Sequence, residues 1–222
     1  RAPPTIEIDG VGGYAPAPAV GRPRVLEVGT YCGFSAMRMA MSRPGCTVVS
    51  VEADAAHVAI ARCLIAFAGL SDAISVRTGH SQDVLPWLAE QSDEPGFDAV
   101  FLDQRGARFG DDLRTLEASG LLHPGAVVVA DNVLKPGAPS YLWHVIRGGS
   151  YHTYIASVAE FAMPDTEDWM SVSVYVPRPT GEAAPPAEPQ PAAVSRLEWE
   201  ADSIRKRAQD AGIGLGVSFE EW

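Results

Sequence analysis

The chain has 222 residues, of which 46% are hydrophobic and 20% are charged, and its formal net charge is −11 at pH 7. A chain of this length can bury the core of one α/β domain of about 150–180 residues and still carry extensions. The acidic balance argues against nucleic acid as a partner, because nucleic-acid binding needs basic patches, and no apolar run reaches the roughly 18 residues of a membrane-spanning helix.

Four segments follow one another along the chain. Proline and glycine mark residues 1–23, which we expect to form an extended arm. Alternating strand and helix patterns then predict an α/β domain over 24–177. A proline-rich linker follows at 178–194, and a helical tail at 195–222 has Ser195 as its expected N-cap. The expected apolar stripe of this tail helix comprises Leu197, Ala201, Ile204 and Ala208.

The domain is predicted to be a doubly wound, mostly parallel, seven-stranded sheet of Rossmann-like type. Continuous β-branched runs suit strands that are buried on both faces, and helical patterns separate them. The last two strands have only a short connection, so they should pair as an antiparallel hairpin at one edge. The predicted strands are 24–28, 46–52, 73–78, 97–102, 126–131, 151–158 and 169–176, and the helices are about 33–42, 55–68, 82–91, 110–119 and 139–147.

A glycine-bounded turn follows the first predicted strand of this domain. Gly29 and Gly33 carry no Cβ, so the backbone between strand and helix can approach a ligand closely. The spacing G-x-x-x-G differs from the dinucleotide fingerprint G-x-G-x-x-G. The pattern therefore suggests a nucleotide-like cofactor of another kind, S-adenosylmethionine (SAM).

Polar side chains follow the next strands. Glu52 closes the second strand, where an acid can accept hydrogen bonds from ribose hydroxyls, although a surface acid after a strand can equally be structural. Ser81 and Gln82 could line an adenine, or Ser81 could merely cap a helix. Asp103, Asp131 and Asn132 end two further strands, and their oxygens suit Mg²⁺, although strand-end acids also cap turns.

Six stretches resemble catechol O-methyltransferase and its relatives in the class I SAM-dependent methyltransferase family, over about residues 24–176. They are VLEVGTYCGFSAMRMA (25–40), VVSVEAD (48–54), FAGLSD (67–72), GHSQDVLPWL (79–88), FDAVFLD (97–103) and VVVADNVLKPGAP (127–139). The resemblance implies methyl transfer from SAM to a hydroxyl of a catechol-like acceptor, assisted by Mg²⁺.

The resemblance also implies a role for individual residues. Glu160 would contact the acceptor. Asp103 would lie on both the SAM side and the metal side, with Asp131 and Asn132 completing the Mg²⁺ ligands. The residues expected to bind SAM are Glu27, Gly29, Tyr31 and Ser35 for the methionine portion, Glu52 for the ribose, and Ser81 with Gln82 for the adenine.

Two departures from the family pattern concern the acceptor side. The family's general-base lysine is expected at the position of Gly106, and glycine cannot accept a proton. Lys135 follows Asn132 closely and is an alternative base. Residues 1–24 cannot build the family's N-terminal lid helices. We therefore expect a non-catalytic or weakly active subunit of a larger assembly, the alternative being an active Mg²⁺- and SAM-dependent O-methyltransferase of a catechol-like small molecule.

Partners and compartment are the least constrained by the sequence. The extensions at 1–24 and 178–222 are the expected binding sites for protein partners, and peripheral attachment to a membrane complex stays open. The chain is expected to be soluble. It begins at Arg1, so removal of a leader, and with it an organelle location, is an alternative.

Overall fold

The computed structural model describes residues 5–7, 22–91, 96–160, 163–177 and 188–211. The chain divides into two compact units, which are described separately below. Unit 1 comprises Arg1–Tyr14, Arg105–Gly110 and Ala130–Trp222, and unit 2 comprises Ala15–Gln104 and Asp111–Val129.

Unit 2 is built on a sheet with the strand order β6-β5-β2-β3-β4. The pairs β2–β3, β2–β5 and β3–β4 are parallel. The strands are β2 (Arg24–Val28), β3 (Thr47–Glu52), β4 (Ile74–Thr78), β5 (Phe97–Leu102) and β6 (Leu122–Ala130).

The winding of unit 2 reverses between β2 and β5. From β2 the chain steps outward through β3 to β4, then returns to β5 and continues to β6 on the other side. Right-handed crossovers therefore place the helices of the two halves on opposite faces, and the carboxyl end of β2 lies at the switch point. The connecting helices are α1 (Phe34–Ser42), α2 (Ala55–Phe67), α3 (Ser81–Gln91) and α4 (Phe109–Ala118).

One apolar core fixes α1 and α2 on strands β2, β3 and β4. Ala36 of α1 and Val58, Ala61 and Ile65 of α2 pack in one cluster with apolar strand residues. These helix positions recur at intervals of three and four residues, so they share a helix face, as the sequence pattern predicts. The strand residues in the cluster are Val25, Val48, Ile74 and Val76.

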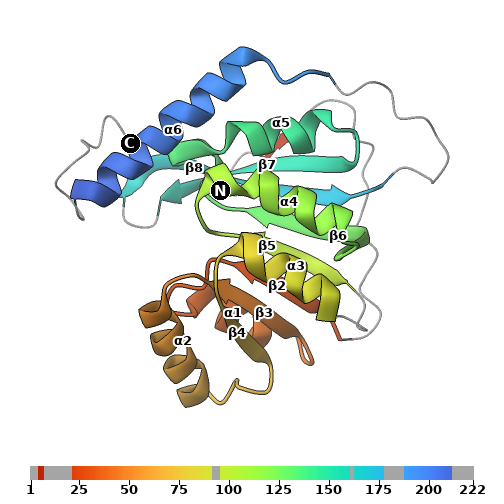
Figure 1. The fold of residues 1–222 in the computed structure, drawn as a ribbon, viewed down its shortest axis with the longest axis vertical. Coiled ribbons are helices and arrows are strands. Elements are labelled where there is room, and N and C mark those ends of the chain that lie inside the picture. Colours follow the sequence, from red (N-terminus) through yellow and green to blue (C-terminus); the bar gives the residue numbers. More distant parts are fainter. Residues whose placement is uncertain (1–4, 8–21, 92–95, 161–162, 178–187, 212–222) are drawn as a thin grey trace. The chain divides into compact units, whose positions relative to one another are not determined.

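Unit 1 contains an antiparallel sheet with the order β1-β7-β8. Helix α6 contacts α5, and the two helices lie side by side (Figure 1). The elements are β1 (Thr5–Glu7), β7 (Tyr151–Glu160), β8 (Met163–Tyr175), α5 (Pro139–Arg147), α6 (Ala192–Ala211) and the short helical turns η1 (Gly106–Arg108) and η2 (Val133–Gly137).

The predicted fold class is confirmed, with differences in detail, one of which is that β6 begins at Leu122, four residues earlier than predicted. The parallel strands and the β7–β8 hairpin are the seven predicted strands, and β1 is added to them inside the predicted extended arm. β8 begins at Met163, six residues earlier than predicted. Helix α6 begins at Ala192, so Ser195 lies inside the helix and its prediction as the N-cap is wrong.

Within the described ranges, none of the helices has the length and apolar character needed to cross a bilayer.

Candidate functional site

The turn after β2 has a steric reason for its first glycine. Gly29 has a φ of +102°, and a Cβ there would overlap the carbonyl oxygen of Asp103 and lie 2.7 Å from its carbonyl carbon. Gly33 has a φ of +83° and precedes α1. The sequence predicted close approach of Gly29 to a ligand, and the structure shows close approach to the backbone end of β5.

Glu27 on β2 is fully buried and lies in a hydroxyl network. Ser35 of α1 and Ser50 of β3 each donate a hydrogen bond to its carboxylate, and Ser50 also pairs with Thr30. Burial raises the pKa of Glu27 above its usual 4.5, and the two serine hydrogen bonds oppose that shift. Glu27 and Ser35, which were both predicted to lie near the methionine portion of SAM, are thus hydrogen-bonded to each other.

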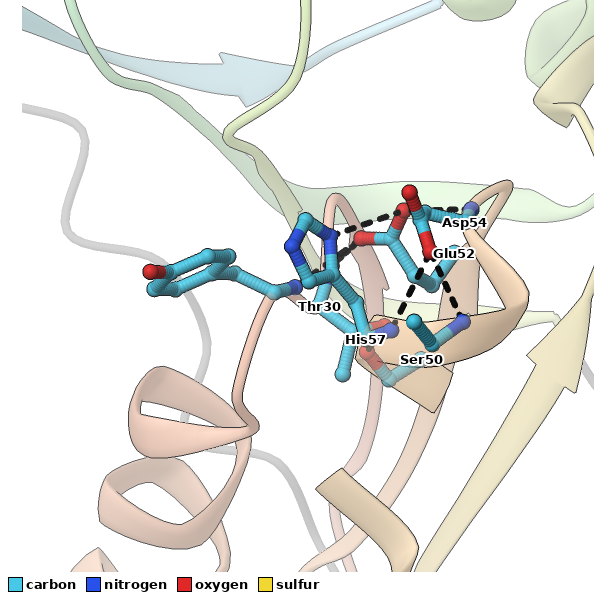
Figure 2. Close-up of polar contacts among 7 residues, drawn as sticks. Thr30, Ser50, Glu52, Asp54 and His57 are labelled. Atoms are coloured by element: carbon cyan, nitrogen blue, oxygen red, sulfur yellow. Dashed lines mark hydrogen bonds and ion pairs between the residues drawn. The ribbon is translucent and has the colours of Figure 1, made fainter. Parts of the chain in front are cut away.

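Glu52 at the end of β3 holds the glycine turn by hydrogen bonds. Its Oε2 accepts from the backbone N–H of Thr30 at 3.2 Å and of Tyr31 at 2.9 Å, and its Oε1 accepts from Asp54 N–H at 2.8 Å. Figure 2 shows the carboxylate between this turn and the start of α2, where His57 Nδ1 lies 4.0 Å from Oε1. The predicted ribose-binding acid therefore has a fixed position.

Tyr31 presents its side chain to solvent from this turn. Its φ is +47° and it is 66% exposed. Its ring stands edge-on to His57, with 4.7 Å between the ring centroids. Asp54, whose pKa is lowered by hydrogen bonds from Ala56 N–H and His57 N–H, caps the helix that carries His57.

The carboxyl ends of β3 and β4 meet next to this carboxylate. Gly79 N–H, just past β4, donates to the carbonyl oxygen of Glu52 at 2.9 Å. Ser81 is buried at the start of α3 and Gln82 is exposed beside it. The predicted adenine-side residues and the predicted ribose acid therefore come from adjoining strand ends of unit 2.

The predicted metal ligands divide between the two units. Asp103 follows β5 in unit 2, is exposed, and donates its N–H to Val28 O at 2.9 Å. Asp131 and Asn132 follow β6 in unit 1. Among the described residues, no group of three or more His, Cys, Asp or Glu side chains is gathered for a metal ion. A site made from the two aspartates and the asparagine amide stays a prediction from the sequence.

Asp168 on β8 is a residue that the sequence analysis missed. It is 1% exposed, and Asn132 Nδ2 donates to its Oδ2 at 2.8 Å. Its Oδ1 accepts from the N–H groups of Leu134 (3.3 Å), Lys135 (3.0 Å) and Trp169 (2.6 Å). The carboxylate thus orients the Asn132 amide and holds the turn that follows it. The sequence analysis placed Asp168 in the short connection before the last predicted strand, whereas the structure places it inside β8.

The last two predicted positions concern the acceptor side. Gly106 lies in η1 and is buried against Arg205 of α6. Glu160 ends β7 at a register shift in the β7–β8 pairing. The side chain of Glu160 lies outside the described residues, so its predicted contact with an acceptor stays a prediction.

A parallel sheet with a glycine turn at its switch point, held by a carboxylate from the neighbouring strand β3, is the arrangement of a Rossmann-like domain. The model of the O-methyltransferase family matches residues 19–140. A catechol O-methyltransferase from Sus scrofa is 41% identical over 157 residues, which cover 69% of this chain and 83% of that protein. The chain belongs to the O-methyltransferase family.

Further relatives share less of their length with this chain. The catechol O-methyltransferase of Bos taurus is 44% identical over 57% of this chain and 46% of its own length. Catechol O-methyltransferase B of Danio rerio is 38% identical over 69% of this chain and 58% of its own length. The chain therefore spans about half the length of several relatives that it matches.

Solved structures confirm the fold. An O-methyltransferase from Bacillus cereus, solved in complex with SAH, gives a TM-score of 0.62 at 24% identity over 68% of this chain and 73% of that one. The O-methyltransferase TomG from Streptomyces achromogenes, solved with SAM, gives a TM-score of 0.62 at 22% identity. The match covers 69% of this chain and 73% of that one.

The buried Glu27 gives a prediction for pH. Its folded-state pKa lies above the unfolded value of 4.5, so its contribution to the free energy of unfolding grows as the pH falls through the folded pKa and is complete below 4.5. Glu27→Gln should remove this contribution. Urea denaturation of both proteins between about pH 8 and pH 4.5 measures the difference, with Glu90→Gln on an exposed position of α3 as the control. If the free energy of unfolding changed equally with pH in the wild type and both variants, the predicted contribution of Glu27 would be contradicted.

Asp168 gives a prediction for stability. Asp168→Asn removes a buried anion that accepts four hydrogen bonds, so the free energy of unfolding should fall by about 2–4 kcal/mol. Chemical denaturation measures the change, and hydrogen exchange should locate the loosened amides at Leu134 and Lys135. The exposed Asp165→Asn on the same strand is the matched control and should change stability by less than about 0.5 kcal/mol.

Proposed function

We propose that the protein is a SAM-binding O-methyltransferase domain that transfers methyl groups weakly to a catechol-like small molecule. The observation that carries this proposal is the hydrogen bonding of Glu52. Its carboxylate accepts from the N–H groups of the glycine turn at the switch point of the sheet. The family membership and the names of the catechol O-methyltransferase relatives support the reaction type.

The residues of unit 2 fit the cofactor. Glu52 Oε2 accepts from two backbone N–H groups, whereas Oε1 accepts from one and retains acceptor capacity, which suits a ribose hydroxyl. Ser81 and Gln82 stand at the next strand end. Glu27, Gly29, Tyr31 and Ser35 would adjoin the methionine portion. SAM supplies the electrophilic methyl group, and these residues would bind and orient it.

The metal-ligand residues fit Mg²⁺ by their chemistry. Asp103 and Asp131 provide carboxylate oxygens. The Asn132 amide donates through Nδ2 to Asp168, so its Oδ1 is the atom left to serve as a ligand. When bound, Mg²⁺ would supply a Lewis acid that lowers the pKa of an acceptor hydroxyl. Glu160 is proposed to accept a hydrogen bond from the acceptor.

Weak activity follows from position 106. Without a side chain there, Gly106 cannot serve as a general base, and Arg205, which packs over it, is a guanidinium that stays protonated. Loss of a positioned base costs about 10²–10⁴ in rate. The same observation favours a second candidate, a non-catalytic subunit that keeps the SAM-binding half. Partner binding through 1–24 and 178–222 belongs to that candidate, although the described helix α6 packs on its own unit.

Calorimetry with SAM tests the cofactor site. The wild-type chain should bind SAM with a Kd in the micromolar range. Glu52→Gln should weaken binding at least about tenfold, because it loses a charged partner for the ribose and places an amide against the turn. Asp72→Asn, an exposed acid of unit 2, should bind like wild type. A wild-type chain that binds no SAM would refute the enzyme and would select a non-catalytic subunit with no cofactor bound.

Methyl transfer to a catechol tests the metal residues and separates the two candidates. Slow, Mg²⁺-dependent transfer that Asp131→Ala abolishes while SAM binding persists supports the weak enzyme. The exposed Asp165→Ala should transfer at the wild-type rate. SAM binding with no transfer above the rate without protein selects the non-catalytic subunit instead.

A further inference from the structure

Helix α6 docks on unit 1 through a buried arginine. Among the residues 192–207, whose side chains are described, the buried ones are Ala201 and Arg205, at 6% and 7% exposure, and they lie one helical turn apart. The helix contacts α5, η1 and η2 (Figure 1). Because a buried cation is costly unless its donors are used, the partners of Arg205 indicate what this contact does.

Arg205 occupies the space above Gly106 and binds the turn after Asn132. Its Nη2 donates to the carbonyl oxygen of Gly137, the last residue of η2. A Cβ on Gly106 would overlap Nη2 of Arg205 and lie 2.9 Å from the Gly137 carbonyl oxygen. Position 106 therefore requires glycine for space, so that the guanidinium can reach across η1 to η2.

Two further hydrogen-bonded pairs fix the helix in this position. Arg105 donates from Nε and Nη2 to the two carboxylate oxygens of Asp202, at 2.7 and 2.9 Å. Glu198 accepts from the N–H of Ser140 in the first turn of α5 at 2.9 Å. Such a donor has no partner inside its own helix, so the carboxylate stabilises the start of α5. Helix α6 is thus bound to η1, η2 and α5.

The charges around Arg205 keep it in its cationic form. Burial lowers the pKa of its guanidinium, and the carboxylates of Glu198 and Asp202 oppose that shift, while Arg105 adds to it. An arginine with a depressed pKa still carries its proton at neutral pH. The contact with Gly137 is therefore charge-assisted and stronger than a neutral hydrogen bond.

We propose that Arg205 is a positioning residue, supplied by the C-terminal helix, that locks the loop before η1 and the η2 turn into one arrangement. Through η2 it fixes Asn132 and Asp131, so the metal side of the site is incomplete unless α6 is docked. The effect on metal use rests on the proposed function. The docking of α6 and the locking of η2 do not depend on the proposed function, and hydrogen exchange measures them separately.

Hydrogen exchange of the full chain tests the locking. Arg205→Met removes the charge and the donors, and Gly106→Ala forces the guanidinium away. Both should speed amide exchange in 192–207, 105–108 and 133–137 about 10- to 100-fold. Lys206→Met, which removes the neighbouring exposed cation of α6, should exchange like wild type. Unchanged exchange in 133–137, with or without loosening of α6, would overturn the proposal.

Kinetics then distinguish positioning from simple stabilisation. Arg205→Met should raise the KM for Mg²⁺ at least about fivefold while the Kd for SAM stays at the wild-type value, because the SAM residues belong to unit 2. Arg205→Lys keeps the charge and should recover part of the loss. An unchanged KM for Mg²⁺ in a variant with a loosened η2 turn would overturn the positioning role. A wild-type chain with no SAM binding would refute the proposed function, and hydrogen exchange would still decide the docking.

Discussion

The close approach of Gly29 to the backbone of Asp103 is the constraint on which the candidate SAM site depends. Gly29 N–H reaches Val51 O and Asp103 N–H reaches Val28 O, both at 2.9 Å, so the hydrogen bonds of the sheet continue past the strand ends. A side chain at position 29 would separate these segments. With the turn in this close contact, the N–H groups of Thr30 and Tyr31 donate to Glu52, and the carboxylate that would bind a ribose is held before any ligand arrives.

Unit 1 is organised by two buried charges of opposite sign at the ends of one short helical turn. Asp168 accepts from the N–H groups of Leu134 and Lys135 at the start of η2, and Arg205 donates to the carbonyl of Gly137 at its end. The carboxylate accepts from N–H groups at one end of the turn and the guanidinium donates to a carbonyl group at the other, while Lys135 between them has non-helical backbone angles. Five residues without an apolar helix face thereby acquire a defined conformation next to Asn132.

The sequence analysis succeeded where the determinants are local and failed where they are distant. Continuous β-branched runs and helical spacing predicted the strands β2 to β6 and the helices α1 to α5, and the glycine turn is the local signal from which a SAM site is predicted. Asp168 and Arg205 contact Asn132 and Gly137 across 36 and 68 residues, which periodicity cannot reveal. The family resemblance ends near residue 176. The predicted apolar stripe on the tail helix holds only in part: Ala201 is buried as expected, but Leu197 is 54% exposed and the charged Arg205 is buried.

The lack of space at position 106 restricts the mutational paths open to this chain. Any residue larger than glycine there would displace the Arg205 guanidinium and would also press on the carbonyl oxygen of Gly137, which lies 2.9 Å from the added Cβ. An Arg205 substitution made alone removes only the first of these contacts and leaves a vacancy under the C-terminal helix. A lysine at 106 therefore requires both a change at Arg205 and a shift of the η2 turn. A glycine that shows no positive φ can thus be as tightly constrained as one that does.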